Sequence, residues 1–172
     1  LKAGCPLQGL GLQSHLWIDI PEGVIAAYMR EISQFGLPIH VSELDCTLRT
    51  ENRLDLRGEA DRIAAQGARV TELASAFAAL PRAQQFAFTV WGLRDTDSWY
   101  RQGDKDDGRD KPLPFDSFGR PNPMAAALAA GFLRSVRSAV APSDPSSSIA
   151  SAAFGLSHPA GSAGKRAICA VI

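Results

Sequence analysis

The chain has 172 residues, and its 18 Lys and Arg residues balance 18 Asp and Glu residues. A hydrophobic share of 45% is enough to bury one core, so disorder is excluded for most of the chain. The formal net charge of zero provides no electrostatic basis for binding nucleic acid or an anionic membrane surface, and we expect neither partner.

Neither a membrane span nor a signal peptide is visible in the sequence. No apolar run approaches the roughly 18 residues that a span requires. The start, Leu1–Pro6, lacks the charged and then apolar pattern of a signal peptide, and the absence of an initial Met predicts that the chain begins inside a longer protein. Cys5, Cys46 and Cys169 lack the close spacings of zinc or redox motifs, so we interpret them as free thiols.

Strand and helix patterns alternate along the first 140 residues. Apolar periodicity with Gly and Pro breaks predicts strands over 9–16, 37–45 and 86–93, and helices over 21–36, 58–80 and 123–136. A polar loop over 94–122 precedes the last helix. This alternation predicts an α/β fold with parallel strands joined by right-handed crossovers. Residues 141–172 are rich in Ser, Ala, Gly and Pro, and we expect a low-complexity linker or disordered tail there.

Polar or tryptophan side chains occupy the carboxyl end of each predicted strand. Parallel strands covered by helices are normally apolar throughout, so these positions are exceptions. The active sites of barrel enzymes gather at this end of the strands. The side chains concerned are Gln13 and His15, Glu43 and Asp45, and Trp91.

Strict alternation assigns the side chains of the middle strand to two faces. Ile39 and Val41 then share a face with Glu43 and Asp45, while His40 points the opposite way. In the third strand, alternation places Phe86, Phe88 and Val90 on the face opposite Trp91.

Four motifs in succession carry a family resemblance. They are Gly11–Leu16, Ser42–Asp45, Val90–Asp95 followed by Ser98–Trp99, and Pro112–Asp116. Together they resemble glycoside hydrolase family 10, the β-1,4-xylanases with a (β/α)8 barrel. Their order matches the sixth, seventh and eighth strands of that barrel. The resemblance therefore implies that residues 1–140 form a partial TIM barrel, made of strands six to eight with their helices.

The same resemblance implies roles for six residues, a substrate and a location. Glu43 would be the nucleophile of a retaining mechanism, held by a hydrogen-bond network with His15 and Asp45. A nearby donor such as His15 favours the ionised carboxylate that the attack requires. The substrate would be xylan or a xylo-oligosaccharide, no cofactor or metal is implied, and the location would be extracellular or periplasmic. Gln13 and Trp91 would line the subsite for the cleaved sugar, and Trp99 would close over it.

The second carboxylate of a retaining glycosidase is missing from the chain. In the family, the acid/base glutamate follows an asparagine at the end of the fourth strand, and no Asn-Glu pair occurs here. We therefore expect a fragment that lacks the amino-terminal barrel segment, carries the nucleophile half of the site and has no activity alone.

Other interpretations remain open at this stage. A metal-dependent hydrolase would use His15, His40, Glu43 and Asp95 as ligands, although alternation points His40 away from the others. A truncated remnant would bind sugar weakly at most. Trp91 and Trp99 would be core aromatics under the blandest interpretation. The acidic residues between positions 95 and 110 fail the spacing of a calcium loop, which predicts a solvated loop instead.

Overall fold

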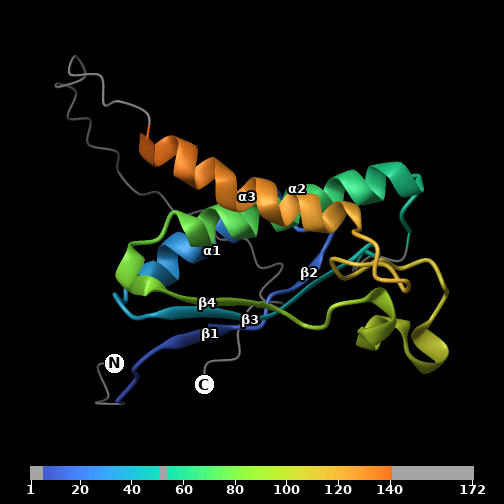
Figure 1. Ribbon diagram of the computed structural model, residues 1–172, viewed down its shortest axis with the longest axis horizontal. Helices are drawn as coiled ribbons and strands as arrows, with labels where there is room; N and C mark the ends of the chain where they lie inside the picture. The colour runs from blue at the N-terminus through green and yellow to red at the C-terminus, as the bar shows by residue number, and fades with distance from the viewer. Residues whose placement is uncertain (1–5, 51–53, 141–172) are drawn as a thin grey trace.

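The computed structural model describes residues 6–50 and 54–140, which form three successive strand–helix units. β3 is the central strand, with β1 and β2 paired along one side and β4 along the other, all in parallel. The three helices lie together on one side of the strands (Figure 1). The predicted α/β fold with parallel strands is confirmed. The elements are β1 (Leu10–Leu12), β2 (His15–Trp17), α1 (Val24–Ser33), β3 (Ile39–Thr47), α2 (Glu59–Ala78), β4 (Gln85–Val90) and α3 (Pro123–Val140).

The first predicted strand is interrupted at Ser14, whose φ of 64° lies in the left-handed region. The prediction of one continuous strand over 9–16 is therefore wrong. Leu10 pairs with Ile39, 29 positions later, whereas His15 pairs with Asp45, 30 positions later. The pairing with β3 therefore shifts by one residue across the break, because β3 has one more residue than the first strand between these pairs, and His15 lies directly beside Asp45.

β3 contains an irregularity that reverses its side-chain alternation. The register against β4 shifts between Val41 and Leu44, and both of these side chains are fully buried. One extra residue in a strand moves every later side chain to the other face. The prediction that Val41 shares a face with Glu43 is therefore wrong, because Val41 packs in the core while the Glu43 side chain stays partly exposed.

The position predicted for His40 is corrected by the same irregularity. Since Val41 and Leu44 both face the core, their neighbours His40 and Glu43 both point away from it. His40 accordingly reaches β4, where its Nε2 lies 2.9 Å from the Thr89 hydroxyl. Phe86 also departs from the predicted pattern, since it is 71% exposed and its ring lies against His40 instead of joining the core.

The core lies between β3 and the helices. Ile39 and Leu44 of β3 are fully buried, and the helices contribute Met29, Val70 and Phe77. Burying each such side chain stabilises the fold by about 1.5–3 kcal/mol. α1 begins three residues after the predicted start at 21, because the left-handed Gly23 (φ 84°) precedes Val24.

The remaining predictions for the chain have mixed outcomes. The loop over 94–122 is confirmed, and it contains three short 3-10 turns, including Trp99–Arg101. Cys46 is a buried free thiol, as predicted. The predictions for Cys5, Cys169 and the tail 141–172 lie outside the described residues.

α2 and α3 pack closely through small residues. The Thr71 hydroxyl donates to the Ala127 carbonyl at 3.1 Å, and the Ser75 hydroxyl donates to the Gly131 carbonyl at 3.1 Å. A Cβ added at Gly131 would lie 2.5 Å from the Ala74 Cβ and 2.9 Å from the Thr71 carbonyl oxygen. The helices therefore require a glycine at this position.

We predict that Gly131→Ala lowers the melting temperature, although Ala is favoured over Gly in helices by about 1 kcal/mol. The added methyl group has no room and must push the two helices apart. Gly67→Ala is the matched control, because its Cβ would meet the Ala127 Cβ at an ordinary 3.7 Å. That control should leave the melting temperature unchanged or raise it. Thermal unfolding followed by circular dichroism tests both, and an equally stable Gly131→Ala protein would contradict the close packing.

Candidate active site

The start of β2 and the carboxyl-terminal part of β3 bring three polar side chains together. His15 starts β2, and Glu43 and Asp45 lie in the second half of β3. The pairing of His15 with Asp45 sets the two strands side by side at this point. The backbone N–H of Glu43 donates to the Gln13 carbonyl at 3.1 Å, which continues the contact between these strands.

His15 lies between the two carboxylates. Its Nδ1 is 3.0 Å from Asp45 Oδ1, and its Nε2 is 3.3 Å from Glu43 Oε2. The hydrogen bond with Asp45 raises the pKa of His15 above its ordinary value, and the negative charges of Asp45 and Glu43 add to the increase against the opposing effect of burial. A protonated His15 can donate to both carboxylates at once. The imidazole therefore couples the two acids.

Asp45 is completely buried, and its second oxygen is bonded by Trp99. The Trp99 indole Nε1–H donates to Asp45 Oδ2 at 2.8 Å. An ionised carboxylate is costly to bury without donors, and here His15 and Trp99 supply one to each oxygen. The side chain of Glu43 is 21% exposed, so Glu43 is the carboxylate of this group that an external molecule can reach.

Two indoles flank His15. The ring of Trp99 lies 5.4 Å from the His15 ring, and that of Trp91 lies 6.4 Å from it at an interplanar angle of 77°. Trp91 is 48% exposed and Trp99 is 41% exposed. Both indoles are therefore partly exposed on the face of the strands that carries Glu43. Gln13 adjoins this group through its backbone and is itself partly exposed.

The four side chains considered as metal ligands are not brought together. His40 bonds Thr89, and Asp95 accepts hydrogen bonds from the Asn122 amide and the Leu113 backbone N–H. Within 6–50 and 54–140, no three His, Cys, Asp or Glu side chains are arranged to hold a metal ion. The metal-dependent alternative therefore has no geometric support in this part of the chain.

Two acidic residues of the loop over 94–122 contradict the prediction of a solvated loop. Asp95 and Asp110 are each only 2% exposed, and burial raises the pKa of both carboxyls. Sequence reasoning missed Asp110, which the Thr47 hydroxyl and the Leu48 backbone N–H contact at the end of β3. Its position just before the motif Pro112–Asp116 was the one available signal.

Tyr100 is a second residue that the sequence did not reveal. Its ring is buried and lies 4.6 Å from the ring of Trp99 and 6.2 Å from that of Trp17. The buried Tyr100 ring therefore packs between the rings of Trp99 and Trp17 and restricts the position of the Trp99 indole.

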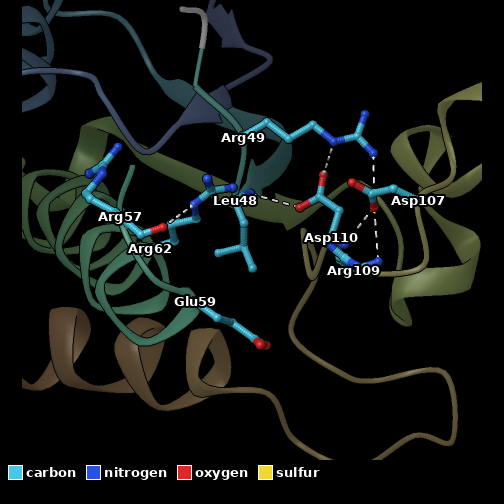
Figure 2. A pocket seen from close by; sticks show the side chains of 8 residues that line it. All are labelled: Leu48, Arg49, Arg57, Glu59, Arg62, Asp107, Arg109 and Asp110. Carbon is cyan, nitrogen blue, oxygen red and sulfur yellow. Dashed lines mark hydrogen bonds and ion pairs between the residues drawn. The ribbon is translucent and has the colours of Figure 1, made fainter. Parts of the chain in front are cut away.

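A cavity of about 370 Å³ lies beside the end of β3 and does not coincide with the site (Figure 2). Three of its four arginines are paired with acids: Arg57 and Arg62 contact Asp55, and Arg49 contacts Asp107. None of the site residues lines it. The lining residues are Leu48, Arg49, Arg57, Glu59, Arg62, Asp107, Arg109 and Asp110.

Comparison with known proteins decides the family. The sequence profile described as Glycosyl hydrolase family 10 matches residues 1–130. The chain belongs to this family. It is 29% identical over 125 residues to the endo-beta-1,4-xylanase Xyn10C of Cellvibrio japonicus, an alignment that covers 65% of this chain and 20% of the relative. It is 28% identical to endo-1,4-beta-xylanase A of Caldicellulosiruptor saccharolyticus over 70% of this chain and 36% of that protein.

Solved structures of family 10 xylanases share this fold. A thermostable mutant of Xyn10A from Cellvibrio japonicus superposes with a TM-score of 0.63 and 28% identity, covering 76% of this chain and 42% of that one. Xylanase10C from Cellvibrio japonicus, in complex with xylopentaose, gives a TM-score of 0.61 and 26% identity over 76% of this chain and 28% of that one. The chain thus forms part of a (β/α)8 barrel and spans less than half the length of these relatives.

We predict that Asp45→Asn lowers the pKa of His15, because the bond with Asp45 is the largest cause of its increase. An NMR titration of the His15 imidazole measures this change. Asp104→Asn, in an exposed turn, is the matched control and should leave the midpoint unchanged. An unchanged midpoint in Asp45→Asn would contradict the contact.

The raised pKa of His15 also determines the sign of its effect on folding. The folded-state pKa lies above the ordinary value of 6.5, so the folded protein binds the proton more tightly than the unfolded chain does. The stability from this group is therefore fully present below about pH 6.5 and is lost as the pH rises through the folded-state value.

Proposed function

We propose that this chain carries the nucleophile half of the active site of a retaining endo-1,4-β-xylanase, with Glu43 as the nucleophile. One observation supports this above the others: Glu43 is the reachable carboxylate in the carboxyl-terminal part of a parallel strand, bridged by His15 to the buried Asp45, and two exposed indoles lie beside His15. Catalytic groups of (β/α)8 enzymes lie at this end of the strands. In this proposal, β1 and β2 together correspond to strand six of the barrel, β3 to strand seven and β4 to strand eight. The barrel segment covers residues 1–140.

Glu43 would attack the anomeric carbon of the bound sugar. The new bond joins a Glu43 oxygen to that carbon, while the glycosidic C–O bond breaks and its electrons pass to the leaving oxygen. A second carboxylic acid protonates the leaving oxygen and later takes a proton from the water that releases the sugar from Glu43. His15, held by Asp45, would fix the orientation of the Glu43 carboxylate and provide a positive charge beside it.

The second carboxylate must come from elsewhere in a complete barrel. Retaining enzymes place their two carboxyl groups about 5–5.5 Å apart on opposite sides of the bond. Asp45 cannot fill this role, because it is fully buried and both of its oxygens are already bonded by His15 and Trp99. We assign the acid/base role to an amino-terminal barrel segment beyond this chain.

The exposed indoles support a sugar-binding role. The C–H groups of a pyranose ring pack against aromatic faces, and the partly exposed rings of Trp91 and Trp99 both lie beside His15. We infer that Trp91 and Gln13 line the subsite of the cleaved sugar and that Trp99 closes it. The xylopentaose bound to the related Xylanase10C supports xylo-oligosaccharide as the ligand class.

The polymeric substrate supports a location outside the cytoplasm, either extracellular or periplasmic. Xylan is too large to cross a membrane intact. No helix in the described ranges is both long and apolar enough to span a bilayer.

We predict that Glu43→Gln abolishes xylan hydrolysis by the protein that unites this chain with the rest of a barrel. The amide has nearly the same shape but is a far weaker nucleophile, so turnover should fall by at least about 10³-fold while oligosaccharide affinity changes little. Steady-state kinetics and calorimetric binding measure the two quantities. Glu59→Gln removes an exposed carboxylate and is the matched control, with normal turnover expected. Unchanged turnover in Glu43→Gln would remove Glu43 from the role.

We further predict that the 172-residue chain alone releases no sugar from xylan, because it lacks the acid/base carboxylate. The same chain should bind xylopentaose weakly at most, which an NMR titration of the Trp91 and Trp99 indole signals would detect. Hydrolysis by the isolated chain that disappears in Glu43→Gln would show that a second carboxylate is present after all.

A further inference from the structure

Asp110 joins the long loop after β4 to the end of β3. Its Oδ1 accepts the Leu48 backbone N–H at 2.8 Å, and its Oδ2 accepts the Thr47 hydroxyl. The Arg49 Nε lies 3.5 Å from the same Oδ2. Asp110 is 2% exposed, so these donors replace the water that its carboxylate would otherwise bind. The contacts begin two residues after Asp45.

The backbone beside Asp110 extends the same attachment. The Pro112 carbonyl accepts the Cys46 N–H at 3.0 Å. The Gln66 side-chain amide, from α2, donates to the carbonyls of both Cys46 and Lys111. The loop therefore runs alongside β3 over the residues that directly follow Asp45, and α2 holds both segments.

A second contact leads from Asp110 to Trp99. The Arg101 guanidinium donates from its Nη1 to the Asp110 carbonyl at 2.9 Å. Arg101 is the last residue of the 3-10 turn that begins with Trp99. The indole N–H of Trp99 then reaches Asp45. The loop is thus attached to β3 at two points. Trp99, at the start of the turn, bonds Asp45, and Arg101, at its end, bonds Asp110, which in turn bonds Thr47 and Leu48.

We propose that Asp110 is a positioning residue, which holds the Trp99–Arg101 turn against the end of β3 so that the Trp99 indole N–H reaches Asp45. A loop of this length has many conformations, and a single indole hydrogen bond is a weak means of selecting one of them. The buried bonds of Asp110 select the conformation in advance, so Trp99 loses little further freedom when it bonds Asp45. The effect on Trp99 rests on these contacts alone, whereas any effect on turnover rests on the proposed function.

Hydrogen exchange of the tryptophan indole N–H groups tests this role in the full chain. The three tryptophans provide three indole signals in a ¹H–¹⁵N spectrum, and Trp99→Phe identifies that of Trp99. In Asp110→Ala, the Trp99 indole N–H should exchange at least about tenfold faster, as expected when the support of a buried hydrogen bond is lost. Far-ultraviolet circular dichroism reports whether the fold is retained. Asp104→Ala, in the exposed part of the same loop, should leave all three exchange rates unchanged.

Arg101→Ala provides an independent test should Asp110→Ala fail to fold. This substitution keeps the buried bonds of the Asp110 side chain but cuts the contact with the turn. It should also accelerate exchange of the Trp99 indole. If the Trp99 exchange rate stays within about twofold of the original in the substituted proteins that fold, the positioning role is overturned.

The two proposals can fail separately. Faster Trp99 exchange in Asp110→Ala, combined with normal turnover in Glu43→Gln, would leave the role of Asp110 intact and remove the proposed nucleophile. Loss of turnover in Glu43→Gln without any change of Trp99 exchange in Asp110→Ala would do the reverse.

Discussion

The Asp45 carboxyl group is fully buried, and the surrounding structure supplies hydrogen-bond partners to it from two directions. His15 approaches along the neighbouring strand, and Trp99 approaches from the loop after β4. Loss of either hydrogen bond would leave a buried carboxylate oxygen without a donor, at a cost in folding free energy of roughly 1–3 kcal/mol or more. The fold is therefore stabilised by keeping both His15 and Trp99 in place. Glu43 gains its fixed partner through this arrangement, because the imidazole that bonds Asp45 also faces Glu43.

Two local irregularities make this arrangement possible. The backbone of the first strand breaks at the left-handed Ser14, and an extra residue of β3 between Val41 and Leu44 shifts its pairing and turns Glu43 away from the core. A regular strand would have paired His15 one residue out of step and buried Glu43 among apolar side chains. Backbone irregularities of this kind are common near active sites, where they redirect a side chain that regular geometry would place elsewhere.

The face that carries the site is the one opposite the helices. Phe86 and Trp91 are exposed on β4 or directly after it, at 71% and 48%. Parallel sheets are normally covered on both faces, and in a closed (β/α)8 barrel the inner face is covered by the remaining strands. The exposure of Phe86 is what we expect where a barrel is represented by three of its units, and it agrees with the share of the family structures that this chain spans.

The sequence by itself determined the features that depend on neighbouring residues. Apolar periodicity predicted the α/β alternation and the extent of α2, and the short motifs resembled the family that the profile shows and pointed to Glu43, His15 and Trp99, which the fold brings together. Tertiary structure alone decided which way β3 turns its side chains after Val41 and which of the loop carboxylates are buried. The physical reason is that a register shift is defined only against a partner strand, and a buried Asp110 is stable only because Thr47 and Leu48, more than 60 positions earlier, provide donors. Only its position just before the motif Pro112–Asp116 distinguishes Asp110 in the sequence from the exposed Asp104 of the same loop.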